Sequence, residues 1–238
     1  MKVVRMSTRR DGADGDLVER FVDDLSARLD GSRRAKADML REVRHGLSDA
    51  AAGYRESGMA AAEAEAAAVA EFGRPAELAG EFQVELAARQ TRFALGFFAV
   101  TGPVGETLSR IQWSNAEPVG PVASPPEYTY LLSQAVDVVG WGASLLAVVL
   151  LLAMGFGFSP LRFRTGLAQL VAWSMLAKVV LFTVAGAALM VLYGRFEPFA
   201  DPFSLLVGLS HPVFAGVAVW LAWRCLRTAG HADRLAPA

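Results

Sequence analysis

Three long apolar segments constrain this 238-residue chain more than any other feature. They cover about residues 131–155, 166–193 and 203–223, so each reaches the roughly 20 residues that a helix needs to cross about 30 Å of hydrocarbon. Hydrophobic residues make up 53% of the chain, which is high for a soluble protein. We therefore expect an all-α protein whose C-terminal part is a transmembrane helical bundle.

Charged residues are concentrated before these segments. Residues 1–92 hold 15 basic and 17 acidic side chains, whereas residues 93–238 hold only 8 and 7. This asymmetry predicts a disordered tail at 1–15, a polar N-terminal domain at 16–92, a membrane domain at 93–223 and a cytoplasmic tail at 224–238. The chain begins with basic residues, but no apolar stretch follows, so we expect no signal peptide and a cytoplasmic N-terminal domain.

The charges between the apolar segments predict the direction in which each one crosses. Arg162 and Arg164 precede the second segment, and Arg224, Arg227 and Arg234 follow the third, so both places are expected on the cytoplasmic side. The proline-rich connection at 114–130 has no basic residue, and the loop at 194–202 carries Arg195 against Glu197 and Asp201. Both are expected outside. With three spans and a cytoplasmic N-terminal domain, each of these four places would lie on the side of the membrane opposite to the one that its charges predict.

A fourth and weaker span at 93–113 removes this conflict. Its 21 residues would extend about 31 Å as a helix, with Arg89 and Arg92 before it and Trp113 at the far interface. We therefore prefer four spans, with both termini in the cytoplasm and a location in the cell (inner or plasma) membrane. The alternative is an interfacial helix at 93–113 and three spans.

The N-terminal domain has the pattern of a small amphipathic helical bundle. Residues 16–29 place their apolar side chains within one arc of a helix, and a second helix at about 33–56 repeats such a stripe. Ser32 is a suitable N-cap for the second helix, and Gly58 ends it. A third helix is expected at about 60–72, and a fourth from Pro75.

The stretch "EFGRPAEL" at 71–78 predicts a corner between the third and fourth helices. Gly73 suits the residue after a helix, because glycine adopts positive φ without steric cost. Pro75 suits the first turn of the next helix, where no backbone N–H is needed. Phe72, Gly73 and Pro75 therefore form a candidate corner motif.

This region resembles the HAAS and permease-prefix family of small cytoplasmic helical domains in bacterial, often actinobacterial, membrane proteins. The resemblance covers about residues 16–92, and its most specific part is Glu71-Phe72-Gly73-x-Pro75 followed by Leu78 and Phe82. The chain differs at the start of the third helix, where Ala60 and Ala61 replace an acid or serine followed by proline. The resemblance implies a signalling or regulatory membrane protein, commonly paired with a PadR-like transcription regulator or joined to a permease, and it implies no catalytic residues.

Ionisable residues within the expected spans are the candidate functional site, because such residues are expensive in hydrocarbon. With four spans, five of them fall between the midplane and the outer face: Glu106, Arg110, Asp137, Lys178 and His211. Glu106 and Arg110 have the i, i+4 spacing of an intrahelical ion pair, and Asp137 could pair with Lys178. The cluster could hold helices together, with Gly140, Gly142, Gly186 and Gly208 supporting close packing, or it could form a ligand or proton pocket.

The sequence offers little support for catalysis or nucleic-acid binding. No phosphate-binding loop, zinc helix or nucleophile elbow occurs, and the net charge is −1. We expect no cofactor, no metal and no enzymatic activity. The predicted function is a membrane-anchored regulatory protein that binds a cytoplasmic protein partner and could form homo-oligomers, and the alternative is a permease or an accessory subunit of a transporter.

Overall fold

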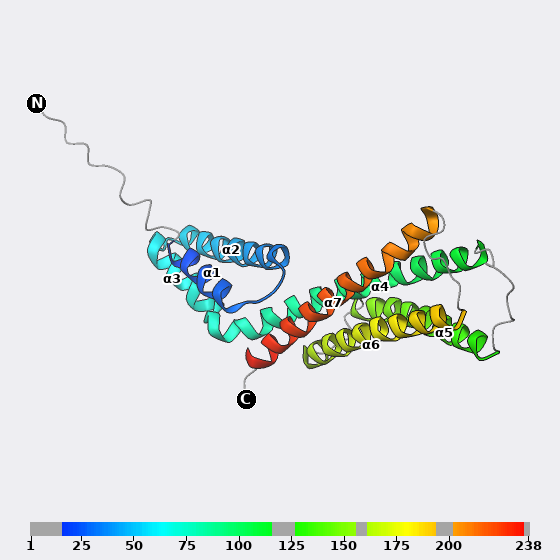
Figure 1. Cartoon of the computed structure of the whole chain (residues 1–238). Coiled ribbons are helices and arrows are strands. Elements are labelled where there is room, and N and C mark those ends of the chain that lie inside the picture. The colour runs from blue at the N-terminus through cyan, green and yellow to red at the C-terminus, as the bar shows by residue number, and fades with distance from the viewer. Residues whose placement is uncertain (1–15, 116–126, 156–160, 194–201, 236–238) are drawn as a thin grey trace, which may run out of the picture. The chain divides into compact units, whose positions relative to one another are not determined.

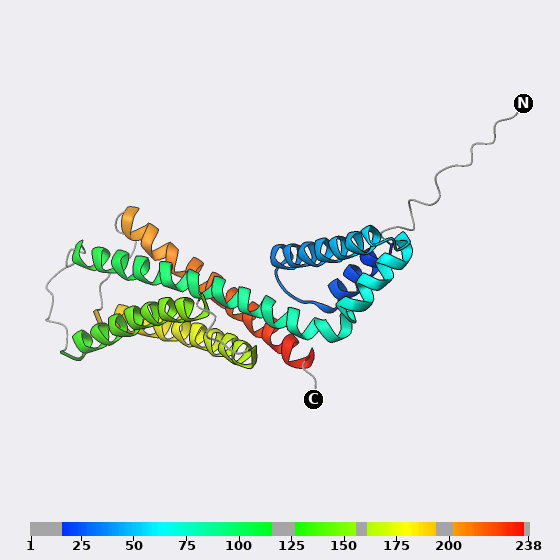
Figure 2. The same ribbon diagram turned by 180° about the vertical axis from the view of Figure 1, so that it is seen from behind.

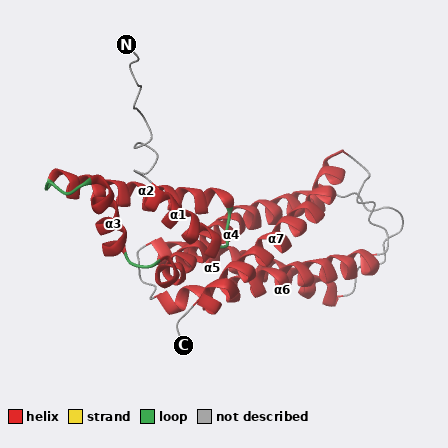
Figure 3. Cartoon of the chain, turned by 90° about the vertical axis from the view of Figure 1, so that its left-hand side faces the viewer, coloured by secondary structure: helices red, strands yellow, loops and turns green. Residues whose placement is uncertain are grey.

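The computed structural model of the chain describes residues 16–115, 127–155, 161–193 and 202–235, and every regular element in them is a helix (Figure 3). The all-α prediction is therefore confirmed. The seven helices are α1 (Asp16–Arg28), α2 (Arg33–Glu56), α3 (Ala61–Phe72), α4 (Pro75–Asn115), α5 (Glu127–Gly155), α6 (Leu161–Tyr193) and α7 (Pro202–Leu235).

Several predictions concern residues that the structure does not describe. The N-terminal tail at 1–15, most of the connection at 114–130 and nearly all of the loop at 194–202 lie outside the described residues, as do the side chains of Trp113, Arg162 and Arg164.

The described residues form two compact units, each with its own hydrophobic core. The first, here called the module, contains residues 16–86 and 230–235, and the second, the bundle, contains residues 87–229. The helices α4 and α7 each contribute residues to both units. Figures 1 and 2 show α1, α2 and α3 of the module, and α4 to α7 of the bundle running side by side.

The module core forms from the apolar faces of its helices. Phe21 and Leu25 of α1 and Leu47 of α2 are almost completely buried. Phe21 also meets Phe72 of α3 edge to face, with 5.5 Å between the ring centroids, a favoured aromatic geometry. The 3.6-residue spacing of these side chains brings them onto one side of each helix, which explains why the helices pack.

Local signals define where the helices of the module begin and end. The Ser32 hydroxyl accepts a hydrogen bond from the Ala35 N–H at 3.2 Å, so Ser32 is the N-cap of α2 as predicted. Ala60 at the start of α3 makes no side-chain cap. Gly73, at φ 101°, ends α3, and α4 begins at Pro75, which confirms the expected corner.

A buried glutamine joins α4 to the connection between α1 and α2. The Gln83 side chain, 0% exposed, accepts from the Asp30 N–H at 2.9 Å and donates to the Asp30 carbonyl at 2.8 Å. One side chain therefore satisfies both backbone groups of a residue 53 positions away. Gly31 comes next, and a Cβ there would lie 3.4 Å from Leu86. The connection thus packs closely on α4.

The C-terminal end of α7 belongs to the module. Leu235 packs against the module core, and the His231 ring Nε2 lies 2.8 Å from the Arg28 carbonyl oxygen. A Cβ at Gly80 would lie 3.2 Å from the Leu235 carbonyl oxygen, so a glycine allows this close approach. The sequence assigns residues 224–238 to a tail, but α7 continues to Leu235 because Ala229 and Ala232 supply a buried face where hydropathy alone falls.

An exposed ion pair links α1 and α2. The Arg44 Nε and Nη2 donate to the two carboxylate oxygens of Glu19 at 2.7 and 2.8 Å. These bonds hold the pKa of Glu19 below its ordinary value. The stabilisation is therefore present at neutral pH and is lost as the pH falls through the lowered pKa. Because both side chains are exposed, it amounts to less than about 1 kcal/mol.

The bundle core combines small and apolar side chains from all four of its helices. Residues of α4 pack there with residues of the three strongly apolar helices, and the buried set is Ala88, Ala94, Leu95, Ala147, Met154, Val171, Ala172, Met175, Ala218, Leu221, Ala222 and Cys225. Within the described residues, three segments are long and apolar enough to cross a membrane, namely Tyr130–Gly155, Thr165–Ala188 and Pro202–Leu235. The expected span at 93–113 is not among them, so that crossing stays a prediction.

We predict that Gln83→Leu loosens the module. The leucine would remove both hydrogen bonds that Gln83 makes to the part-buried backbone of Asp30, a loss of about 1 kcal/mol for each bond. Hydrogen exchange of the full-length protein in detergent should show lower protection in α1 and α2. Glu81→Leu, an exposed position on the same helix, is the control. Equal protection in Gln83→Leu and the wild type would contradict this account.

Candidate functional site

The five predicted intramembrane residues all lie in the bundle, and each of its helices contributes at least one. Glu106 and Arg110 come from α4, Asp137 from α5, Lys178 from α6 and His211 from α7. The two acidic and two basic side chains make the set balanced in formal charge. A balanced set is the arrangement in which charges are tolerated away from water.

Arg110 and Asp137 form an ion pair between α4 and α5. The Arg110 Nη2 donates to the Asp137 Oδ2 at 2.7 Å, and the two side chains are 58% and 37% exposed. The i, i+4 spacing favours Arg110 with Glu106, but the structure places the hydrogen bond between helices instead. The arginine therefore joins two elements of the bundle rather than bracing one.

Glu106 lies deeper, against the backbone of α5. Its side chain is buried, and a Cβ added at Gly140 would collide with its Oε1. A Cβ at Gly140 would also meet the Phe182 ring, and the Lys178 Nζ lies over that ring. Arg110 is bound to Asp137, the residue that the sequence pairs with Lys178.

Aromatic rings complete the surroundings of Lys178. Its Nζ lies 4.9 Å from the centre of the Phe182 ring and 5.5 Å from that of Phe98. Aromatic faces attract cations, and the attraction increases when the cation is removed from water. The ammonium is therefore stabilised by two aromatic rings.

His211 makes polar contacts within α7 and across to α4. Its Nδ1 lies 2.8 Å from the Val207 carbonyl oxygen, and its Nε2 lies 3.5 Å from the Ser109 hydroxyl. If Nδ1 carries the proton and donates to Val207, Nε2 is an acceptor for Ser109. No group of three or more metal-binding side chains occurs in the described part of the chain.

Small residues allow the helices to approach at this site, and the sequence analysis missed two of them. A Cβ at Gly102 of α4 would collide with the Ser144 hydroxyl, and that hydroxyl donates to the Gly140 carbonyl at 3.0 Å. Of the glycines predicted to support packing, Gly140 has a close contact, with Glu106, whereas Gly142 and Gly186 face open space. The recurrence of small residues in α4 and α5 is the signal that identifies Gly102 and Ser144.

The corner motif has a structural role in the module. Phe72 packs against Phe21, Gly73 has the positive φ that ends α3, and Pro75 starts α4. Next to it, the Tyr54 hydroxyl donates to the Glu71 Oε2 at 2.6 Å, and this bond raises the pKa of Tyr54. These contacts orient helices and form no catalytic arrangement.

Comparison of the chain with protein-family models, with curated proteins and with solved structures finds no match. The resemblance to the HAAS and permease-prefix family therefore stays a prediction.

We predict that the charges of Arg110 and Asp137 can be exchanged. Arg110→Asp or Asp137→Arg alone leaves two like charges facing each other, so each should lower the thermal stability of the full-length protein in nanodiscs. The double exchange should recover most of the loss, with a coupling of about 1 kcal/mol, as for other interhelical polar contacts in membranes.

The exchange of Glu106 with Arg110 is the matched control. It preserves the charges of α4 but not the contact between α4 and α5. If thermal stability is recovered in this control and not in the Arg110/Asp137 exchange, the ion pair is intrahelical.

Proposed function

We propose that the chain is a non-enzymatic, membrane-anchored regulatory protein whose module binds a cytoplasmic protein partner. In this proposal the bundle crosses the membrane four times, and both termini lie in the cytoplasm. A change at the polar cluster alters the position of α4 and thereby the surface that the module offers to its partner. A PadR-like transcription regulator is the partner class that the family resemblance implies.

The observation that carries this proposal is the continuity of α4. This helix contains 41 residues, and Pro103 lies inside it. Leu86 belongs to the module core, whereas Ala88 and Leu95 belong to the bundle core, and Glu106 and Arg110 lie further along the same helix. The same helix therefore connects the polar cluster and the module along the chain, and Pro103, which lies between them, is a position where it can bend.

The C-terminal end of α7 supports an even number of crossings. Leu235 and His231 pack in the module together with residues of α1 and α4. A chain whose last helix ends on the side where its first helix lies must cross the bilayer an even number of times. With α5, α6 and α7 crossing, residues 93–113 are the segment available for the fourth span.

The exposed side chains of α4 also support four membrane crossings. Phe93 and Val100 are 63% and 64% exposed, and Val104 and Ile111 are exposed on the same helix. Exposed apolar side chains are suited to contact with lipid, and the polar Glu106 is buried inside the bundle.

The cytoplasmic end of α7 carries pairs of aromatic and basic side chains. The Arg224 guanidinium lies 4.9 Å from the Trp220 ring centre, and that of Arg227 lies 5.5 Å from the Trp223 ring centre. Tryptophan and arginine are characteristic of the membrane interface, and arginine marks its cytoplasmic side. This favours the orientation with α7 ending in the cytoplasm.

Single-cysteine labelling tests the topology, because Cys225 is the only native cysteine and is buried. In a Cys225→Ala background, we predict that an impermeant maleimide labels Ser124→Cys in intact cells. Ser7→Cys and Ala236→Cys should react only after permeabilisation. With three spans and a cytoplasmic N-terminus, Ser124→Cys would be protected and Ala236→Cys labelled.

Regulation is tested with the neutral double variant Glu106→Gln, Arg110→Gln. We expect its transcript profile to change in the same genes as that of a strain lacking the chain, while membrane insertion and cysteine labelling stay unchanged. Unaltered transcripts in both strains, together with altered solute uptake, would favour the transport alternative.

A photo-crosslinker tests the partner directly in the full-length chain. At His45, which is exposed on α2, it should capture one cytoplasmic protein in native membranes. At Val180, which is exposed on α6 of the bundle, it should capture lipid and no such protein. Capture of the same protein at both positions would contradict binding through the module.

A further inference from the structure

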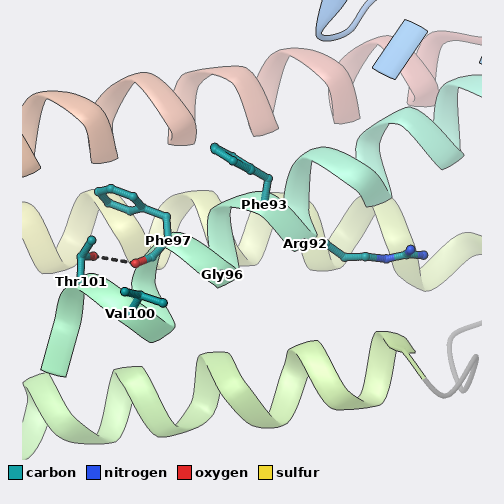
Figure 4. Close-up of a pocket in the computed structure, with 6 residues that line it drawn as sticks. All are labelled: Arg92, Phe93, Gly96, Phe97, Val100 and Thr101. Carbon is teal, nitrogen blue, oxygen red and sulfur yellow. Dashed lines mark hydrogen bonds between the residues drawn. The ribbon is translucent and has the colours of Figure 1, made fainter. Parts of the chain in front are cut away.

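A shallow apolar depression follows α4 in its first turns within the bundle. Six residues line it, namely Arg92, Phe93, Gly96, Phe97, Val100 and Thr101 (Figure 4). These residues lie on one side of the helix, and five of them offer carbon or a backbone-bonded hydroxyl, because the Thr101 hydroxyl donates to the Phe97 carbonyl at 2.7 Å. The depression therefore has an apolar surface with one charged end.

Gly96 forms the floor of this depression. A Cβ added there would meet nothing within 4 Å, so the space above the glycine is open. Phe93 and Val100 stand on either side in the sequence and are both exposed. A flexible hydrocarbon chain is the kind of group that fills an open apolar channel of this shape in a membrane.

Arg92 lies at one end of the depression. Figure 4 shows its side chain extending away from Thr101, towards the N-terminal part of α4. Arginine extends in this way when its apolar stem lies in hydrocarbon and its guanidinium reaches the headgroup level. Arg89 precedes it by one turn, and α4 has no acidic residue between Glu85 and Glu106. Two basic side chains of α4 therefore lie at or near this end of the depression, with no acidic residue of the same helix segment beside them.

The length of the depression matches one leaflet. Arg92 and Thr101 are nine residues apart, which corresponds to about 14 Å along a helix. Half of a hydrocarbon core of about 30 Å is about 15 Å. A guanidinium at the headgroup level thus places the other end of the depression near the bilayer midplane.

We propose that this depression binds an anionic phospholipid of the cytoplasmic leaflet. Arg92 contacts the phosphate of the headgroup, and one acyl chain lies over Gly96 between Phe93 and Val100. The guanidinium has five N–H donors, so it can hold a phosphate in addition to a protein group. The site rests on the proposed fourth span, because it requires Arg92 at the cytoplasmic interface.

The headgroup contact is tested by native mass spectrometry of the full-length protein. The protein is equilibrated in micelles with equal amounts of phosphatidylglycerol and phosphatidylcholine. The wild type should retain phosphatidylglycerol preferentially, and Arg92→Gln should reduce that preference about fivefold. Arg227→Gln removes an interfacial arginine of α7 and should leave most of the preference. Equal losses in the two variants would reduce the site to general surface charge and overturn the proposal.

The acyl-chain contact is tested by filling the depression. Gly96→Leu should remove one bound lipid, whereas Gly142→Leu, another glycine of the bundle facing open space, should not. An excess of glycerol 3-phosphate should fail to displace the lipid. Displacement by that soluble phosphate, or wild-type lipid binding in Gly96→Leu, would overturn the proposal.

Cysteine labelling of the same variants separates this site from the topology. Loss of lipid binding with unchanged labelling at Ser124→Cys and Ala236→Cys assigns the effect to the depression. A labelling pattern of three spans would overturn the lipid site and the proposed topology together. A four-span pattern with no preference for phosphatidylglycerol would overturn the lipid site alone.

Discussion

Packing of the last turns of α7 into the module constrains the rest of this chain. Leu235 contacts a core otherwise made of α1 to α4, and the approach is close enough that Gly80 accepts no larger side chain without displacement of the α7 backbone. In the proposed topology, this contact requires both ends of the polypeptide to lie on one side of the membrane. Three crossings would not meet that requirement, so the proposal assigns a fourth crossing to α4.

The proposed fourth crossing gives a physical reason for the composition of the polar cluster. A span in α4 would bring Glu106 and Arg110 towards the hydrocarbon, where an uncompensated charge is strongly unfavourable. Asp137 of α5 bonds Arg110, and Glu106 lies against Gly140 of α5 beside Phe182, the ring over which the Lys178 Nζ of α6 lies. The glycines at 102 and 140 let these helices approach closely enough for that compensation. The cluster therefore also specifies how the helices of the bundle are paired.

The boundaries of the helices followed from local signals, and the partners of the charges did not. Ser32, Gly73 and Pro75 act on the backbone within a few residues, so their effects can be read directly from the sequence. The partner of Arg110 depends on how α4 and α5 are rotated about their axes. Neither helix has a strongly one-sided apolar face, so their sequences carry little information about that rotation. Spacing alone therefore favoured Glu106, four residues away, over Asp137.

The C-terminal end of α7 also cannot be predicted from local sequence signals. Hydropathy falls after Trp223, so a tail was expected from residue 224, yet the helix continues to Leu235. The helix contains 34 residues and extends about 51 Å, whereas the hydrocarbon accounts for about 30 Å. The 41 residues of α4 likewise extend about 62 Å. Both helices exceed the membrane thickness because part of each belongs to the core of the module.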